Sequence, residues 1–102
     1  MKTTLEILRE ARELISVPER WTTGASARTL DGCELYSGAH EAAVCWCAIG
    51  AIRHSVGKYG NIIDILGELD PRLDEWNDTH THAEVLALFD RTIARMESEG
   101  TP

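Results

Sequence analysis

VCWCAIGAIRH, which occupies residues 44–54, is the part of the sequence that decides the fold, because it is apolar on almost every side of a helix. A helix that is apolar all round is normally buried. We therefore predict a central buried helix over residues 39–56, ended by Gly57, since glycine is favoured just past a helix end. Small residues around Gly50 would let a neighbouring helix pack closely against it.

Two cysteines and a histidine in one short run also suggest a redox or zinc site. In a helix, however, Cys45 and Cys47 would point about 200° apart, because an α-helix has 3.6 residues per turn. His40, Cys47 and His54 share one stripe, but steps of seven residues separate them by about 10.5 Å each. One ion could not bridge that distance. We therefore predict no metal site, no cofactor and no catalytic residue.

The first segment carries a capping box, formed by Thr3 and Glu6, and then apolar residues at helical spacing. This pattern predicts an amphipathic helix that ends near Ser16, because Pro18 disfavours helix at the residue before it. Further along, an Asp-Gly pair at residues 31–32 is typical of a tight turn and predicts a small β-hairpin near residues 27–36.

The second half of the chain predicts shorter helices. Residues 62–69 form one, a turn runs from Asp70 through Trp76, and residues 77–79 connect it to the last helix. A second capping box, Thr81 with Glu84, begins that helix, which ends near residues 98–100. The sequence thus predicts one compact, mainly α domain over residues 1–102, with about four helices, a minor β part and a disordered tail at about 98–102.

The charge of the chain is uneven. Its formal net charge is −7, and residues 57–102 hold 10 acidic against 4 basic side chains. Direct nucleic-acid binding needs a basic patch that replaces counterions, so we expect no nucleic-acid ligand, and for the same reason no anionic membrane. No apolar run approaches the roughly 20 residues of a membrane span. The odd cysteine count of three fits a reducing cytoplasm better than a disulfide framework.

Three motifs of the sequence, taken together, indicate a resemblance to a known family. They are the AVCWCAIGAI run at residues 43–52, Trp-Asn-Asp at 76–78 and Ala-Glu-Val-Leu-Ala-Leu at 83–88. This combination resembles an uncharacterised family of small bacterial and phage proteins, a domain of unknown function. Residues 79–82, Thr-His-Thr-His, depart from the Gly-Arg-Thr-like lead-in expected there. The resemblance implies a soluble single domain and assigns no activity.

The sequence supports three hypotheses for function. The first is a non-enzymatic protein-binding or regulatory module, for instance a phage-encoded inhibitor of a host nucleic-acid-handling system, whose acidic face meets a basic partner protein. The residues expected on that face, opposed nearby only by Arg72, are Asp64, Glu68, Asp70, Asp74, Glu75 and Asp78.

The second hypothesis is a small enzyme or ligand-binding domain with a polar pocket beside the 77–82 connector. Its pocket residues would be His40, Asn77, Asp78, His80 and His82. The third is a homo-oligomerising module, such as a homodimer, formed through apolar surface on the first or last helix. The absence of a nucleophile with a recognisable base partner favours the non-enzymatic hypothesis.

Overall fold

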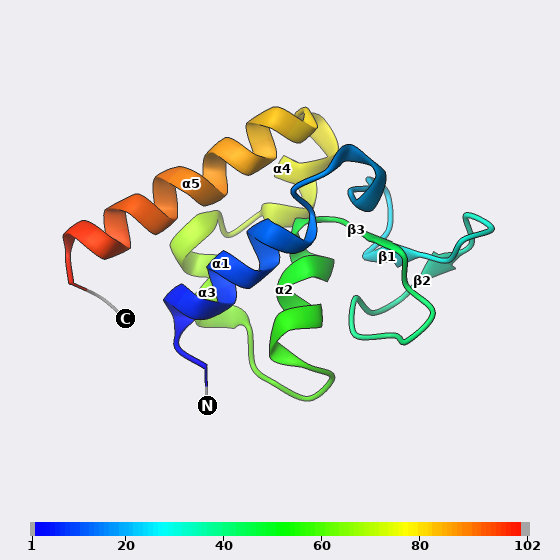
Figure 1. Ribbon diagram of the computed structural model, residues 1–102, viewed down its shortest axis with the longest axis horizontal. Helices are drawn as coiled ribbons and strands as arrows, with labels where there is room; N and C mark the ends of the chain where they lie inside the picture. Colours follow the sequence, from blue (N-terminus) through cyan, green and yellow to red (C-terminus); the bar gives the residue numbers. More distant parts are fainter. Residues whose placement is uncertain (1, 101–102) are drawn as a thin grey trace.

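A computed structural model describes residues 2–100 and shows a mainly α fold with a small sheet, which confirms the predicted class (Figure 1). The described part contains five α-helices rather than about four. In chain order the elements are α1 (Thr4–Leu14), the 3-10 turn η1 (Pro18–Arg20), β1 (Ala27–Arg28), β2 (Glu34–Leu35), β3 (Cys45–Trp46), α2 (Ala48–Val56), α3 (Ile63–Leu69), α4 (Leu73–Thr79) and α5 (His82–Ser98).

The two predicted capping boxes are confirmed. The Thr3 hydroxyl accepts from the Glu6 N–H at 3.1 Å, and the Thr81 hydroxyl accepts from the Glu84 N–H at 3.2 Å. In both helices the glutamate side chain also accepts from the backbone N–H of the threonine. Because these bonds satisfy donors that a helix start leaves free, they fix where α1 and α5 begin.

The predicted central helix over 39–56 is wrong in its first half. Helix α2 begins only at Ala48, and Cys47 before it is extended, with φ −79° and ψ 178°. Residues 45–46 instead form a strand that pairs with β1. A strand satisfies its backbone groups through a neighbour, and here pairing with Ala27 and Arg28 replaces the helix that the apolar composition favoured. The helical angle between Cys45 and Cys47 therefore does not apply.

The sheet is three-stranded and antiparallel, in the order β2-β1-β3. The predicted hairpin is confirmed as β1 and β2, with Ala27 opposite Leu35, although the strands are shorter than expected. Gly32 in the turn has φ +87°, which favours glycine. The third strand was not predicted.

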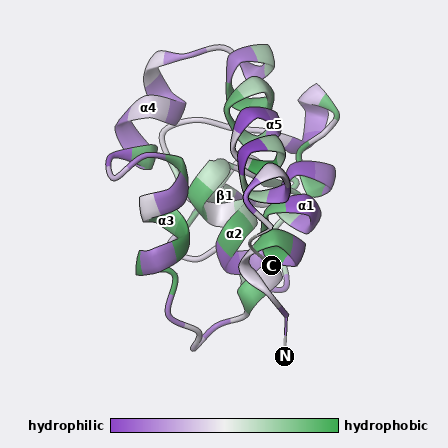
Figure 2. Cartoon of the chain, turned by 90° about the vertical axis from the view of Figure 1, so that its left-hand side faces the viewer, coloured by the Kyte–Doolittle hydropathy of each residue, from purple (hydrophilic) through white to green (hydrophobic). Residues whose placement is uncertain are grey.

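The core lies where α1, α2, α4 and α5 meet. Helix α2 packs against α1 and α4, while α5 packs mainly against α1 and α3 rather than against α2. In Figure 2 the hydrophobic colour of α2 lies in the middle of the molecule, with more polar helices around it. The largest fully buried side chains are Leu8, Ile15, Ile52, Leu73, Asn77, Val85, Phe89 and Met96. Among these, Asn77 alone is polar, and a buried polar side chain needs hydrogen-bond partners inside the protein.

Gly50 permits a close approach, as the sequence indicated, but its neighbours are loops and not a second helix. A Cβ on Gly50 would overlap the Ser26 carbonyl, and a Cβ on Gly38 would overlap the Gly50 carbonyl. Three backbone segments are therefore stacked without side chains between them. This stack holds the sheet and the 37–44 loop against α2.

Two further predictions concern the ends of elements. Residues 77–79, expected as a connector, belong to α4. Helix α5 continues to Ser98, and Glu99 caps it. The rest of the expected disordered tail, residues 101–102, lies outside the described residues. Within residues 2–100, every helix is too short or too polar to cross a bilayer.

Candidate functional site

Asn77 was expected to line a pocket, but it is a buried link between three parts of the fold. Its Oδ1 accepts from the Trp21 indole N–H at 2.8 Å and from the Ala48 N–H at 3.0 Å. Its Nδ2 donates to the Thr22 carbonyl at 3.1 Å and to Asp78 Oδ1 at 3.3 Å. An asparagine amide can accept two hydrogen bonds and donate two, so this side chain is fully used inside the protein.

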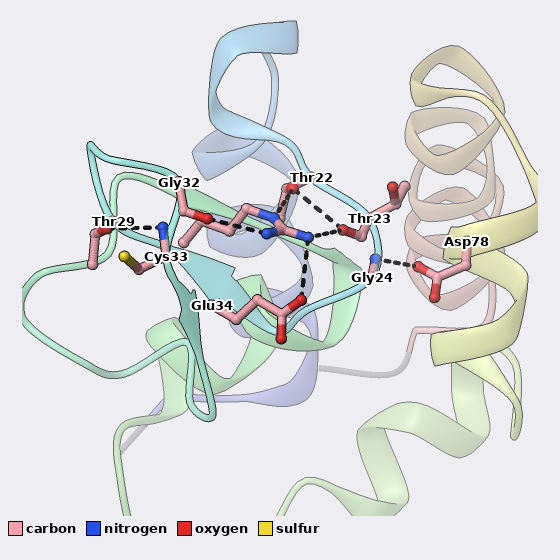
Figure 3. A network of polar contacts seen from close by, with 9 residues as sticks. Thr22, Thr23, Gly24, Thr29, Gly32, Cys33, Glu34 and Asp78 are labelled. Atoms are coloured by element: carbon pink, nitrogen blue, oxygen red, sulfur yellow. Dashed lines mark hydrogen bonds and ion pairs between the residues drawn. The ribbon is translucent and has the colours of Figure 1, made fainter.

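Asp78 continues the same link at the surface. Its Oδ1 accepts from the Gly24 N–H at 3.0 Å, and Figure 3 shows this bond joining α4 to the loop before β1. Gly24 has φ +78°, so the loop turns sharply at the point where Asp78 holds it. Asp78 therefore has a structural partner in addition to its place on the acidic side of α4.

The other side of that loop is held by the guanidinium of Arg28. It donates to the Thr22 hydroxyl at 3.0 Å, to the Thr23 carbonyl at 3.1 Å and to the Gly32 carbonyl at 3.1 Å. Glu34 is a weaker ion-pair partner at 3.8 Å. Arg28 thus ties the hairpin turn to the 22–24 loop, and its charge is occupied within the fold.

The histidines expected in the pocket make separate contacts. His80 stacks on Trp76, with ring centroids 3.6 Å apart and planes 6° apart, and its Nδ1 donates to the Trp76 carbonyl. His82 lies beside Trp21 and donates through Nε2 to the Ile15 carbonyl at 2.7 Å. The His82 contact joins the start of α5 to the end of α1.

His40 lies elsewhere. Its Nδ1 accepts from the Ala42 N–H at 3.0 Å, and the cavity that it lines is shared with Ser37, Glu41 and Lys58. The cavity beside Asp78 is lined instead by residues 24–26, Cys47, Ile49 and Asp74. The structure thus brings Asn77 and Asp78 together and places His40 at a different cavity.

The acidic residues expected to bind a partner lie on α3, on α4 and at the junction between them. Glu68 pairs with Arg95 at 2.8 Å, and Glu75 pairs with Arg72 at 3.5 Å. Asp70 accepts from the backbone N–H of Arg72 at 2.8 Å. Over residues 2–100, neither Asp64 nor Asp74 forms an ion pair or a side-chain hydrogen bond. We call Asp64, Glu68, Asp70, Asp74, Glu75 and Asp78 the acidic face.

Two residues of this region were not predicted. Arg95 reaches the acidic face from α5, so the face is opposed by two arginines and not by Arg72 alone. Ile63, beside Asp64, is 72% exposed although it follows the buried Ile62. The helical spacing of Ile62, Ile65 and Leu69 was the available signal, because it points Ile63 outward.

The three cysteines differ in exposure, and Cys47 is the buried one. Burial raises the pKa of the Cys47 thiol, and its sulfur accepts from the Gly50 N–H at 3.3 Å. A buried thiol of raised pKa is protonated at neutral pH, and so lacks the thiolate that reacts. Cys33, Cys45 and Cys47 are all free. Among residues 2–100, no three metal-ligating side chains come together.

The sequence pattern of a family of unknown function, DUF6197, matches residues 1–95. The chain belongs to this family. No curated protein and no solved structure matches the chain. The DUF6197 match spans every element up to most of α5, so this helical fold is that of a DUF6197 member, and the family assigns no activity to it.

Proposed function

We propose that this DUF6197 member is a non-enzymatic protein-binding module whose acidic face takes a partner protein with a basic surface. The observation that carries the proposal is the charge of that face. Six carboxylates lie there and, within residues 2–100, only Arg72 and Arg95 pair with them. Uncompensated charge of one sign speeds encounter with an oppositely charged partner and selects against wrong partners.

The acidic face also offers an apolar contact. Ile63 is 72% exposed at the start of α3 and adjoins Asp64, which has no ion-pair partner among residues 2–100. Interfaces commonly place apolar side chains at their centre and charged ones at their rim. A basic protein with an apolar residue among its cations would therefore match this surface. A host protein with a basic, nucleic-acid-binding groove, as in the host-inhibitor hypothesis, is one partner with such a surface.

The contacts of the predicted pocket residues favour this proposal over the enzyme hypothesis. Asn77 has no free hydrogen-bonding position, and His80 and His82 donate to backbone carbonyls. Two copies of the chain would not pair through the acidic face, because that would bring carboxylates against carboxylates.

The test compares two charge variants. The face variant combines Asp64→Lys, Asp74→Lys and Glu75→Lys; the control combines Glu19→Lys, Asp31→Lys and Glu41→Lys, which make the same charge change at exposed positions elsewhere. Each protein is immobilised and exposed to lysate of the source organism, and captured proteins are identified and then purified. We expect a basic protein that binds wild type and control, but binds the face variant at least about tenfold more weakly.

The second measurement is the salt dependence of the affinity for the captured protein. Binding of that protein should weaken markedly between about 50 and 500 mM NaCl, because exposed charge pairs are screened over a shorter distance at higher ionic strength. The proposal is overturned if wild type captures nothing that the face variant does not also capture. It is equally overturned if the affinity does not change with salt.

A further inference from the structure

An open cavity of about 410 Å³ lies on another side of the molecule, between α1, η1 and the last turn of α2. Leu14 and the hydrocarbon stems of the longer side chains give it apolar walls. Its volume falls within the range of small-molecule sites, which combine apolar walls with a few polar groups. No residue of the acidic face lines it, so a ligand of this cavity is independent of the proposed function.

Two of its charged residues already have partners. Glu10 accepts from Lys2 Nζ at 2.7 Å and from the Ser55 hydroxyl at 2.8 Å. Arg9 is paired with Glu97 of α5. These contacts join α1 to α2 and to α5, so we assign both residues to the wall of the cavity.

Arg20 and Glu13 are different, because their charges are unpaired. The Arg20 guanidinium lies within 4.0 Å of no carboxylate among residues 2–100, and its Nη2 makes only two long contacts of 3.4 Å, to the Glu13 carbonyl and the Ser16 hydroxyl. Its Nε is buried without a hydrogen-bond partner in the same residues. The Glu13 carboxylate has neither an ion pair nor a hydrogen bond there. A buried donor without a partner, such as Arg20 Nε, is costly, whereas the exposed Glu13 carboxylate is free to meet a ligand.

The balance of charge defines the ligand. The cavity carries Arg9 and Arg20 against Glu10 and Glu13, so its net charge is zero and neither a simple anion nor a simple cation is favoured. Among residues 2–100, the cation of Arg20 and the anion of Glu13 line this cavity without an ion-pair partner. The matching ligand carries both a carboxylate and an ammonium group, together with an apolar part for the wall at Leu14.

We propose that this cavity binds a free α-amino acid with an apolar side chain. The ligand carboxylate pairs with the Arg20 guanidinium, and its ammonium pairs with the Glu13 carboxylate. Both are charge-assisted hydrogen bonds, which are stronger than neutral ones. The side chain of the ligand lies along Leu14. His54, whose Nδ1 faces the Gly38 carbonyl at 3.2 Å, retains Nε2 as a further polar contact.

The test is a titration followed by two-dimensional NMR of the backbone amides. L-leucine is compared with N-acetyl-L-leucine, which lacks the ammonium, and with L-leucinamide, which lacks the carboxylate. We expect saturable shifts around Leu14 and His54 with L-leucine, and affinities about tenfold lower for both analogues. No saturable shift with L-leucine, L-phenylalanine, L-isoleucine or L-valine up to about 10 mM would overturn the proposal.

Variants assign the two ligand groups. Arg20→Gln should weaken L-leucine about tenfold and leave L-leucinamide unchanged, while Glu13→Gln should weaken L-leucine and leave N-acetyl-L-leucine unchanged. Arg91→Gln and Glu19→Gln are matched exposed controls that should bind as wild type does. Because Arg20 also contacts the end of α1, circular dichroism verifies the fold, and Glu13→Gln, whose carboxylate holds no contact among residues 2–100, keeps the test decisive. Equal affinity for L-leucine and N-acetyl-L-leucine, or unchanged binding in both variants, refutes the assignment.

Discussion

Asn77 shows how one polar side chain can hold several segments of a small domain together. Four hydrogen bonds from its amide reach Trp21, Thr22, Ala48 and Asp78, and the side chain is completely buried. A buried amide is costly unless every position is bonded, and here every position is. The start of α2, the segment before β1 and helix α4 therefore depend on one residue.

Replacing Asn77 with alanine should destabilise the protein by about 2–4 kcal/mol, because the Ala48 N–H, the Trp21 indole and the Thr22 carbonyl lose their partner inside the fold. The free energy of unfolding from urea denaturation measures this. Asn61→Ala is the control, since Asn61 is exposed and accepts one bond, from the Ile63 N–H; about 1 kcal/mol or less is expected there. Equal losses for the two variants would contradict the role given to Asn77.

The sequence predicted a connector at residues 77–79 and not the helix α4 that contains them. Asparagine and aspartate have low helix propensity and favour turns, so a connector was the expected structure. The bonds that keep Asn77 in a helix come from residues 29 to 56 positions away. No local pattern carries that information. The surface position of the acidic residues follows instead from their charge, since charged side chains are seldom buried, and all of them but the half-buried Asp70 are exposed.

Helix starts that a capping residue marks could be predicted from the sequence, whereas the start of α2, which strand pairing sets, could not. Thr3 and Thr81 mark α1 and α5 through bonds made within three residues. The start of α2 depends on β3, a two-residue strand whose partner β1 belongs to the preceding hairpin. A strand of that length has no periodicity to recognise, and its apolar residues match a buried helix equally well.

The close approach of α2 to its neighbours gives a matched pair of glycine substitutions. Gly50→Ala should cost about 1–3 kcal/mol, because the new methyl group would overlap the Ser26 carbonyl. Gly67→Ala, in α3, meets no atom within 4 Å and should stabilise the fold by up to about 1 kcal/mol through helix propensity. Thermal unfolding measures whether Gly50→Ala destabilises the protein and whether Gly67→Ala stabilises it. If Gly50→Ala proved as stable as Gly67→Ala, the stacking of three backbone segments at α2 would be refuted.

For the molecule as a whole, surface charges join elements that are far apart in sequence. Arg12 pairs with Asp90 at 2.9 Å, and Arg95 of α5 reaches Glu68 of α3. The sequence predicted the surplus of acid in the second half but could not say which carboxylates have partners. The cavity between α1 and α2 was missed for the same reason, since Arg20 and His54 come to line one cavity only after folding.

Stability should fall as the solution becomes acidic. Hydrogen bonds from Lys2 and then Ser55 lower the pKa of Glu10 below 4.5, and backbone and side-chain hydrogen bonds with Thr81 lower the pKa of Glu84. Because each pKa is lower in the folded than in the unfolded state, the stabilisation is present above about pH 4.5 and is lost as pH falls through the folded-state values. Urea unfolding from pH 7 to about pH 3 measures this, and Glu10→Gln should show a smaller loss than wild type. An unchanged slope in Glu10→Gln would contradict the assignment.

The packing of α5 on α1 affects how the nascent chain can fold during synthesis. Contacts between these helices span 78 residues for Arg12 with Asp90 and 88 for Arg9 with Glu97. Synthesis delivers α1 before α5, so the growing polypeptide exposes the apolar side of α1 until α5 has also been made. Closing so long a loop is also slow compared with forming local helices. We therefore expect the nascent protein to need chaperones during this interval, and the release of α5 from the ribosome to set the time at which the domain can fold.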